Sequence, residues 1–296
     1  MHSTRDIRRR IKSVKSTAQI TKAMQLVASA KMKKAQDQAT NRRPSADMFN
    51  KILVGLREHI EKDAHPFFSE GKGAKTLILV ITTDKGLCGG LNTNLLKKVI
   101  AAADGETDFI TIGRKGAQAL SRLKRHLAAD FSVADPAHFA HIRPVSKLIQ
   151  ELFLSGAYKC VKVAFNNFVN TVTQVPVVET LLPIDHVTLG GKRSLHGLDK
   201  GEAVEVLPGM TPQYTFEPGP AEVLNKIMPD YVAYTLYQMI LEARASEHSS
   251  RMVAMKNATD NAKGMIKDLT LEYNKVRQAA ITNELLEITT AKMALG

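Results

Sequence analysis

The residues with the greatest chemical potential lie in segment 82–92, which reads Thr-Thr-Asp-Lys-Gly-Leu-Cys-Gly-Gly-Leu-Asn. The segment follows a continuous apolar run and precedes an amphipathic stretch, which is where α/β proteins bind ligands. Its three glycines fit neither the Walker nor the dinucleotide spacing, and no Lys-Ser or Lys-Thr pair follows them. We interpret the glycines as allowing tight packing of strand against helix, or contact with a partner.

Other candidate catalytic and metal-binding groups lack the neighbours that their chemistry needs. Cys88 lies near Lys85, but no histidine nearby in the sequence could serve as its base, so we expect a structural thiol. His138 and His141 are the only close histidine pair, and no acidic residue completes a metal-binding motif. We interpret both histidines as loop or surface residues.

The remaining reactive side chains also favour a non-catalytic chain. Glu284 and Glu287 have the residue type of a glycosidase carboxylate pair, but on one helix face they are expected to be exposed or to contact another chain. With only Cys88 and Cys160, the sequence excludes a disulfide scaffold and a cysteine-based zinc site. We therefore predict no catalytic residue, no bound metal and no cofactor held by this chain.

Composition and charge indicate a folded protein with a basic N-terminal segment. The chain has 296 residues, of which 44% are hydrophobic and 24% charged, and no apolar run long enough to cross a membrane. Its first residues lack the apolar core of a secretory signal and the composition of a transit peptide, so we expect a protein that works in the cytosol or on its membrane face. Of the net charge of +12, most lies before residue 44, where twelve basic residues meet two acidic ones. Such a segment is expected to bind nucleic acid, an anionic membrane or an acidic protein surface.

Residues 1–43 contain no proline or glycine and carry a heptad pattern typical of a coiled coil. A second strip on another face predicts more than one neighbour for this helix. The helical pattern resumes over residues 48–60 and stops near Pro66. The main seam consists of Ile7, Ile11, Val14, Ala18, Thr21, Gln25, Ala28, Met32, Ala35 and Ala39, and the second strip of Ile20, Met24, Val27 and Ala30.

Residues 230–296 form a second long helical pattern without proline. If helical throughout, this segment spans roughly 100 Å at about 1.5 Å per residue, a length typical of a coiled coil or a rod. We expect it to pair antiparallel with the N-terminal helix. Its seam consists of Met252, Met255, Thr259, Ala262, Ile266, Leu269, Tyr273, Val276 and Ala280, and the apolar strip then shifts to Ile281, Leu285 and Ile288.

The middle of the chain alternates strand and helix patterns, which predicts a parallel sheet. The expected strands are 76–83, 107–113 and 159–165, the expected helices 91–103, 114–129 and 145–157, with one or two further strands in 169–184 around Pro176 and a loop over 190–220. The predicted fold class is α/β: a long antiparallel two-helix coiled coil from the N- and C-terminal helices plus a small α/β domain with a mostly parallel sheet. The expected boundaries are 1–65 for the N-terminal helix, 66–220 for the α/β domain and 221–296 for the C-terminal helix.

Three segments carry a specific resemblance. They are residues 7–32, beginning Ile-Arg-Arg-Arg-Ile-Lys-Ser-Val-Lys, residues 83–92, and residues 246–285, which include Ser-Glu-His-Ser-Ser-Arg-Met-Val-Ala-Met and Tyr-Asn-Lys-Val-Arg-Gln. Together and in this order they resemble the gamma subunit of F-type ATP synthases.

This resemblance implies a central rotor shaft that couples proton-driven rotation of the c-subunit ring to ATP synthesis or hydrolysis. The shaft stands inside a hexamer of alpha and beta subunits, which bind the Mg-ATP and ADP, and its globular part rests with the epsilon subunit on the c ring. It implies no catalytic residue in this chain, no nucleic-acid partner, and membrane contact only through partner subunits. The implied location is peripheral, on the cytoplasmic face of the bacterial inner membrane.

The resemblance also assigns an interface with the hexamer. Four positions match those near the beta subunit's catch loop and two match the facing segment of the N-terminal helix, although all six could be ordinary coiled-coil surface residues. The sequence departs from the family at Ala291 and Lys292, where relatives usually have Gly-Ala, and residues 190–220 lack the cysteines of the chloroplast redox switch. The six positions are Arg277, Gln278, Thr282 and Glu284, with Lys22 and Met24.

Two other functions remain open from the residues alone. An α/β nucleotide-dependent enzyme with helical arms would use the loop 83–92. A nucleic-acid-binding coiled coil would use the basic N-terminal helix, although its basic residues are not paired with base-reading Asn or Gln at regular positions.

Overall fold

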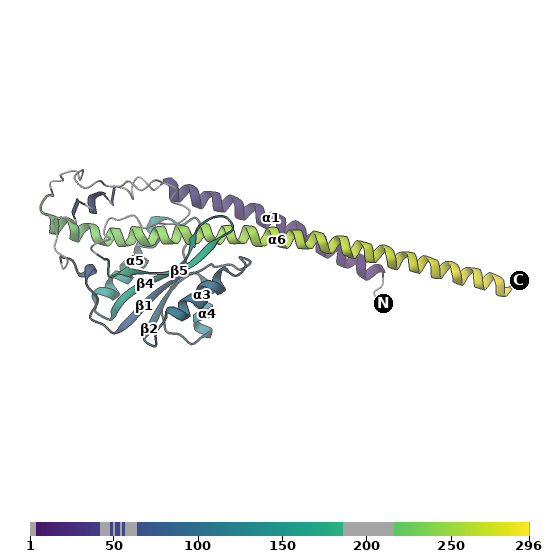
Figure 1. The fold of residues 1–296 in the computed structure, drawn as a ribbon, viewed down its shortest axis with the longest axis horizontal. Coiled ribbons are helices and arrows are strands. Elements are labelled where there is room, and N and C mark those ends of the chain that lie inside the picture. The colour runs from purple at the N-terminus through teal and green to yellow at the C-terminus, as the bar shows by residue number, and fades with distance from the viewer. Residues whose placement is uncertain are drawn as a thin grey trace. The chain divides into compact units, whose positions relative to one another are not determined.

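The computed structural model describes residues 4–41, 48–49, 51–53, 55–56, 64–185 and 216–295. Contacts divide the chain into two compact units: Met1–Ala28 with Arg251–Gly296, here called the helix-pair unit, and Ser29–Ser250, here called the α/β unit. The long helices α1 (Thr4–Asn41) and α6 (Pro220–Leu295) each contribute to both units (Figure 1). The predicted long terminal helices are therefore confirmed.

The α/β unit contains a five-stranded sheet with the order β3-β2-β1-β4-β5. β1 pairs in parallel with β2 and β4, β2 pairs in parallel with β3, and β5 pairs antiparallel with β4. This arrangement confirms the prediction of a mostly parallel sheet. The strands are β1 (Lys75–Ile81), β2 (Thr107–Ile112), β3 (Leu127–Phe131), β4 (Tyr158–Phe168) and β5 (Gln174–Leu182).

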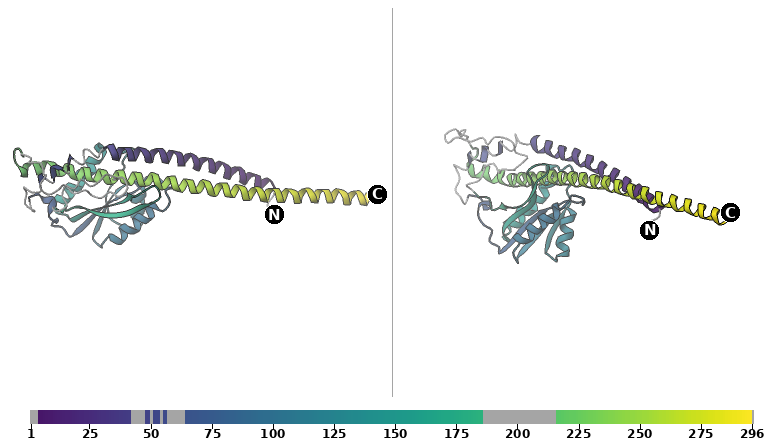
Figure 2. Two further views of the ribbon diagram at one scale, coloured as in Figure 1. Left: turned by 45° about the horizontal axis from the view of Figure 1, so that its top comes forward. Right: turned by 45° about the vertical axis from the view of Figure 1, so that its right-hand side comes forward.

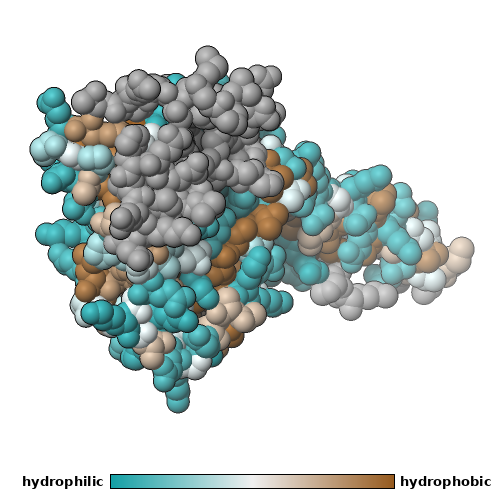
Figure 3. Space-filling model, turned by 60° about the vertical axis from the view of Figure 1, so that its left-hand side comes forward, coloured by the Kyte–Doolittle hydropathy of each residue, from teal (hydrophilic) through white to brown (hydrophobic). Residues whose placement is uncertain are grey.

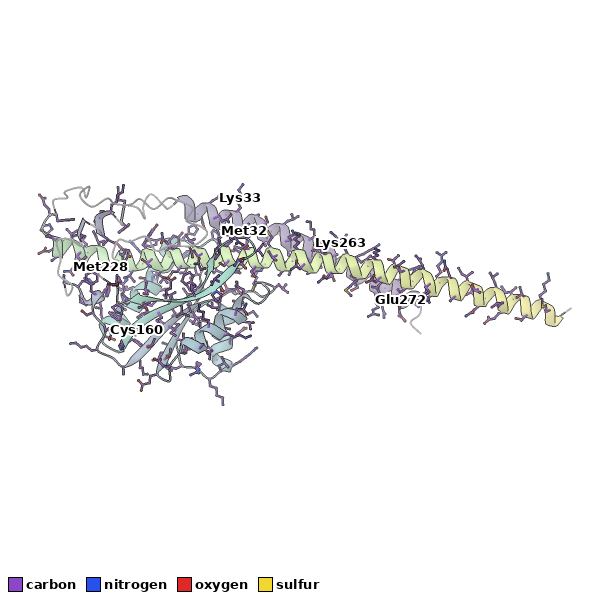
Figure 4. The ribbon with its side chains drawn as sticks, in the orientation of Figure 1. Met32, Lys33, Cys160, Met228, Lys263 and Glu272 are labelled. Carbon is purple, nitrogen blue, oxygen red and sulfur yellow. The ribbon has the colours of Figure 1, made fainter. Side chains whose placement is uncertain are left out.

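Helices cover both faces of this sheet. Leu77 and Leu79 of β1 pack in a core with α5 (Phe139–Leu154) and with buried residues of α6 up to Ala243. Ile78 and Val80 face the other way, into a core with α3 (Leu91–Ala102) and α4 (Arg114–Arg122). Because β1 is buried on both faces, its sequence is continuously apolar. Figure 4 shows Met228 of α6 and Cys160 of β4 in this unit, where Met228 is fully buried.

The predicted helix 114–129 is wrong beyond Arg122. Lys124 adopts a left-handed conformation with φ of 53°, and its amide donates to the carbonyl of Ser121, which closes the helix end. β3 then begins at Leu127 and pairs with β2. The left-handed position is normally occupied by glycine, so the sequence offered no stop signal here.

Two prolines lie inside elements that the sequence pattern divided or shortened. α5 begins at Phe139 rather than after Pro144, because Ile142 is fully buried and the Phe139 ring packs edge-on against Tyr237 at 5.7 Å. β5 is one strand that contains Pro176, which an edge strand tolerates because one side of it needs no ladder hydrogen bonds. Most of the expected loop 190–220 lies outside the described residues, as does Ile60 of the expected helical pattern 48–60. The structure begins α6 at Pro220, the last residue of that expected loop.

Gly113 connects β2 to α4 in a conformation that other residues rarely adopt. Its φ is 101°, and a Cβ atom here would overlap the carbonyl oxygen of Thr82. We expect Gly113→Ala to lower the free energy of unfolding by roughly 2–5 kcal/mol through backbone strain and overpacking. Urea unfolding of the chain measures this loss. The matched control is Gly105→Ala, where a Cβ meets nothing within 4 Å, so an equal effect of both changes would contradict the prediction.

Candidate functional site

α1 and α6 run antiparallel in the helix-pair unit. Arg8 Nη2 donates to the Tyr273 hydroxyl at 2.6 Å, and its guanidinium lies 5.5 Å from the centre of the Tyr273 ring. Further along, the hydroxyls of Thr21 and Thr259 lie 2.8 Å apart. Both views of Figure 2 show the two helices side by side, and α6 extends beyond the N-terminal end of α1. The predicted antiparallel pairing is confirmed.

Small side chains form the contact between these two helices, as the heptad pattern predicted. Ile7 and Ala28 are buried on α1, and Met255, Thr259 and Ala262 are buried on α6. The other seam positions of α6 up to Val276 are partly buried, whereas Ala280 is exposed, so its assignment to the seam was wrong within this chain. Because α1 is described only from Thr4, residue 280 lies beyond its partner helix.

The last part of α6 is exposed on all sides. Every residue from Arg277 to Met293 is exposed among the residues that the structure describes. Several of these exposed side chains are large and apolar. Figure 3 shows apolar residues interspersed among polar ones on exposed helix faces. Exposed apolar side chains gathered on one segment mark a protein contact. Their exposures are 45% for Ile281, 58% for Leu285, 58% for Leu286, 65% for Ile288 and 84% for Met293.

The second strip of α1 is also largely uncovered within the helix-pair unit. Ile20 and Val27 are 57% and 58% exposed, and Met24 is partly buried. The basic residues of the first turns, Arg5, Arg9 and Arg10, are exposed as well, and Arg9 lies 3.5 Å from its neighbour Asp6. This face of α1 thus offers apolar and cationic groups to an outside partner.

The six predicted interface residues fall into two separate places. Lys22 is exposed and donates to Gln25 Oε1 at 3.3 Å, close to the level of Thr21 and Thr259. Arg277 lies about 27 Å further along α6 at 1.5 Å per residue. The structure therefore does not bring the α1 pair beside the α6 group. The residues of the α6 group, Arg277, Gln278, Thr282 and Glu284, are all exposed.

The polar groups of the glycine-rich loop bond within the loop and to neighbouring elements of the α/β unit. Asn92 Nδ2 donates to the Thr83 hydroxyl at 2.8 Å and to Cys88 Sγ at 3.5 Å. Asp84 Oδ1 accepts from the Arg114 amide at 3.1 Å, at the start of α4. Cys88 is 2% exposed, which confirms the prediction of a structural thiol.

The other candidate groups are placed as predicted. His138 and His141 are exposed at the start of α5, with their rings 5.6 Å apart. Within the described ranges, no three His, Cys, Asp or Glu side chains gather as a possible metal site. No helix in the described part of the chain is long and apolar enough to cross a membrane.

A buried ionic network on α6 was missed by the sequence reading. Arg244 Nη1 lies 2.8 Å from Glu247 Oε2, and Nη2 donates to the Val133 carbonyl at 2.7 Å and lies 3.8 Å from Asp84 Oδ2. Arg244 and Glu247 are each 6% exposed. Their spacing of three residues was visible in the sequence, but such pairs usually lie on solvated helix faces.

Asp135, in the loop before α5, connects α1 and α6 within the α/β unit. Its Oδ2 accepts from Lys31 Nζ at 2.7 Å and lies 3.3 Å from Nε2 of the buried His248. Contact with His248, and then with Lys31, holds the pKa of Asp135 well below its ordinary value despite partial burial. Figure 4 shows Lys33, two residues along α1 from Lys31, pointing outward.

Because the native pKa of Asp135 is lowered, its contribution to stability is present above the unfolded pKa of about 3.9 and is lost as pH falls toward the native value. We expect Asp135→Asn to lower the free energy of unfolding by about 1 kcal/mol, equally at pH 7 and pH 5. The deficit should shrink below about pH 4. Urea titrations of this variant and of the exposed control Asp37→Asn measure the deficit, and one that grows on acidification would contradict the account.

Comparisons with known proteins agree with this architecture. The sequence model of the ATP synthase family matches residues 3–295. The chain is 49% identical to the ATP synthase gamma chain of Akkermansia muciniphila over 100% of both chains. It is 45% identical to that of Opitutus terrae over 99% of both.

Solved structures share the fold. A chain of the Euglena gracilis mitochondrial ATP synthase, from a structure of OSCP, F1 and c-ring, matches with a TM-score of 0.68 and 19% identity over 99% of this chain and 94% of that one. A chain of the Tetrahymena thermophila central stalk and c-ring matches with a TM-score of 0.58 and 26% identity over 81% and 99%. From its helix pair, its sheet and its full-length relatives, this chain belongs to the family of ATP synthase gamma chains.

Proposed function

We propose that this chain acts as the central rotor shaft of an F-type ATP synthase and couples rotation of a membrane ring to ATP synthesis or hydrolysis. The observation that carries this function is the form of α6 in a member of the gamma-chain family. This helix pairs with α1 up to Val276, and its residues beyond that point are exposed on all sides. A slim pair of helices with small seam residues can turn inside a surrounding assembly without locking into one position.

Catalysis belongs to other subunits of the complex. The main alternative function, a nucleotide-dependent enzyme, would use the loop 83–92. In this loop Asn92 Nδ2 donates to the Thr83 hydroxyl and Asn92 Oδ1 accepts from the Thr83 amide. The chain therefore contributes mechanical coupling, and Mg-ATP and ADP bind to the partner alpha and beta subunits.

The proposed interface with the alpha–beta hexamer has two parts. The first is the α6 group of Arg277, Gln278, Thr282 and Glu284, which is exposed and adjoins the apolar side chains after residue 280. The second is the α1 segment that carries Lys22 and Met24, and exposed cations also lie in the first turns of this helix. Cations on α1 favour acidic partner loops, because opposite charges attract across an interface without deep packing.

The proposal extends to further partners and to location. The α/β unit is assigned to the membrane end, where it meets the c ring and the epsilon subunit. The complex is placed on the cytoplasmic face of the bacterial inner membrane, with this chain peripheral. The proposed division along the sequence is 1–65 and 221–296 for the two helical segments and 66–220 for the domain that meets the ring. The parts of the helical segments within 29–65 and 221–250 belong to the α/β unit. The similar chain of the Tetrahymena thermophila central stalk and c-ring supports this assignment.

Rotation can be observed directly in the assembled complex. The alpha–beta hexamer is fixed to a surface through its beta subunits, and a bead is attached to the exposed Lys124 position of the α/β unit after substitution by cysteine. Addition of Mg-ATP is expected to drive rotation in one direction. A complex that hydrolyses ATP while the bead only fluctuates would contradict the rotor function.

A further inference from the structure

α6 carries three serines whose side chains leave their own helix. Ser246 Oγ donates to the Asn166 carbonyl of β4 at 2.8 Å. Ser249 Oγ donates to the Thr171 carbonyl in the β4–β5 turn at 2.6 Å, and Ser250 Oγ donates to the Cys88 carbonyl of the glycine-rich loop at 2.7 Å. We call Ser246, Ser249, Ser250 and these three carbonyls the serine clamp. All of its members lie in the α/β unit.

This bonding differs from that of the threonines on α6. Thr259, Thr270 and Thr282 donate to the carbonyl four residues earlier in the same helix, as helical Ser and Thr usually do. The Tyr237 hydroxyl also leaves the helix and donates to the Ala137 carbonyl at 3.2 Å. The clamp is set apart because three hydroxyls within five positions reach a strand, a turn and a loop.

The clamp lies where α6 is enclosed on all sides. Every residue from Ile240 to Ser249 is buried, and Ser246 and Ser249 are both 0% exposed. The amphipathic pattern of the helix-pair unit begins directly after Ser250. The clamp thus bonds the last turn of α6 that belongs to the α/β unit.

We infer that the serine clamp adds the directional restraint that keeps α6 from turning about its own axis inside the α/β unit, so that torque passes from this unit into the shaft. Close packing of the core and the bonds of Arg244 and Tyr237 also resist such turning. The clamp adds three hydrogen bonds at the end of the buried segment, and a hydrogen bond weakens steeply when its angle changes. Three bonds to three different segments oppose rotation of the helix in both senses. The three serines are positioning residues, and this inference rests on the proposed rotor function.

The test replaces two clamp members in the complete complex. Ser249→Ala with Ser250→Ala leaves the Thr171 and Cys88 carbonyls without these donors. The shaft is held in the hexamer with a non-hydrolysable ATP analogue, and the angular fluctuation of a bead on the α/β unit is recorded. If the three clamp bonds and the Arg244–Val133 and Tyr237–Ala137 bonds act as equal parallel springs, removing two of the five is expected to raise the angular variance roughly 1.7-fold. ATP hydrolysis by the unloaded complex is expected to stay within about twofold of the unsubstituted complex, because its catalytic sites are elsewhere.

Two controls separate clamping from general stability. Ser155→Ala removes an exposed serine bond of similar length, 2.8 Å, to Leu152 O three residues earlier at the end of α5, which does not touch α6. Val99→Ala opens the core on the opposite face of the sheet. Both controls are expected to leave the angular variance unchanged, even where Val99→Ala lowers the unfolding midpoint as much as the double serine variant.

The outcomes distinguish the inference from the function on which it rests. A rise in variance confined to the serine variant supports the clamp. An unchanged variance in an assembled and ATP-hydrolysing serine variant overturns it, as does an equal rise in Val99→Ala. If the unsubstituted complex itself never rotates under Mg-ATP, the rotor function fails instead.

Discussion

Arg244→Ala is expected to lower the free energy of unfolding by about 3–5 kcal/mol, the range for breaking a buried ion pair on one side. The guanidinium contacts Glu247 and the Val133 carbonyl inside the α/β unit, and Asp84 lies 3.8 Å away. Its removal takes away a cation 2.8 Å from the buried Glu247 carboxylate and the donor to the Val133 carbonyl, and breaking a buried ion pair on one side is among the costlier changes in a folded protein. Urea unfolding followed by circular dichroism measures the loss.

Two comparisons make this result specific. Arg143→Ala removes a cation of the same type whose ion pair with Asp230, at 3.5 Å, is exposed, so its effect should stay within about 0.5 kcal/mol. Arg244→Met combined with Glu247→Leu replaces both charges by apolar groups and is expected to recover most of the loss. An Arg244→Ala variant as stable as Arg143→Ala would show that the network contributes nothing.

The second large effect concerns the exposed end of α6. Arg277→Ala and Gln278→Ala are each expected to lower ATP turnover of the assembled complex, by roughly tenfold if a desolvated charge-assisted contact of about 1.5 kcal/mol is lost. Both side chains are exposed in this chain, so the changes should leave its unfolding midpoint unaltered. Steady-state hydrolysis of Mg-ATP by the purified complex measures the effect.

The matched control is Lys275→Ala, an exposed residue two positions before Arg277 that is not assigned to the interface. It is expected to keep normal turnover. Unchanged turnover in both Arg277→Ala and Gln278→Ala would remove these residues from the interface, and equal losses in all three variants would show that the effect is not specific to the assigned positions.

Much of the fold was predictable because its elements carry strong periodic signals. The heptad seams predicted that α1 and α6 pair, and a compact domain between them, whose entry and exit lie close together, predicted that they run antiparallel. The contacts of Arg8 with Tyr273 and of Thr21 with Thr259 confirm both. The continuous apolar run of β1 predicted a strand buried on both faces, which the two cores on either side of it confirm.

The misplaced boundaries have local physical causes. The sequence around Lys124 lacks a glycine, although the backbone there takes the left-handed conformation that ends α4. Pro144 is a reasonable helix start by sequence, but burial of Ile142 outweighs the single hydrogen bond that the proline removes. In both places tertiary packing overrides local preference.

Only some of the residues discussed as functional could be predicted from the sequence. Family resemblance led to the proposed interface positions, Arg277 and Gln278 among them, but did not give the distance that separates them from Lys22 on the helix pair. The Arg244 network and the serine clamp were missed because their partners, such as Asp84 and the Thr171 carbonyl, are distant in sequence. No periodic pattern encodes contacts of this kind.

Reconstitution tests the central claim most directly. The chain is expressed with matching alpha and beta subunits, the complex is purified by size exclusion, and Mg-ATP hydrolysis is measured with and without the chain. The account predicts co-elution of one copy per hexamer and a large gain in sustained turnover. Failure to co-elute, together with ATP binding by the isolated chain, would contradict the rotor function and return attention to the loop 83–92.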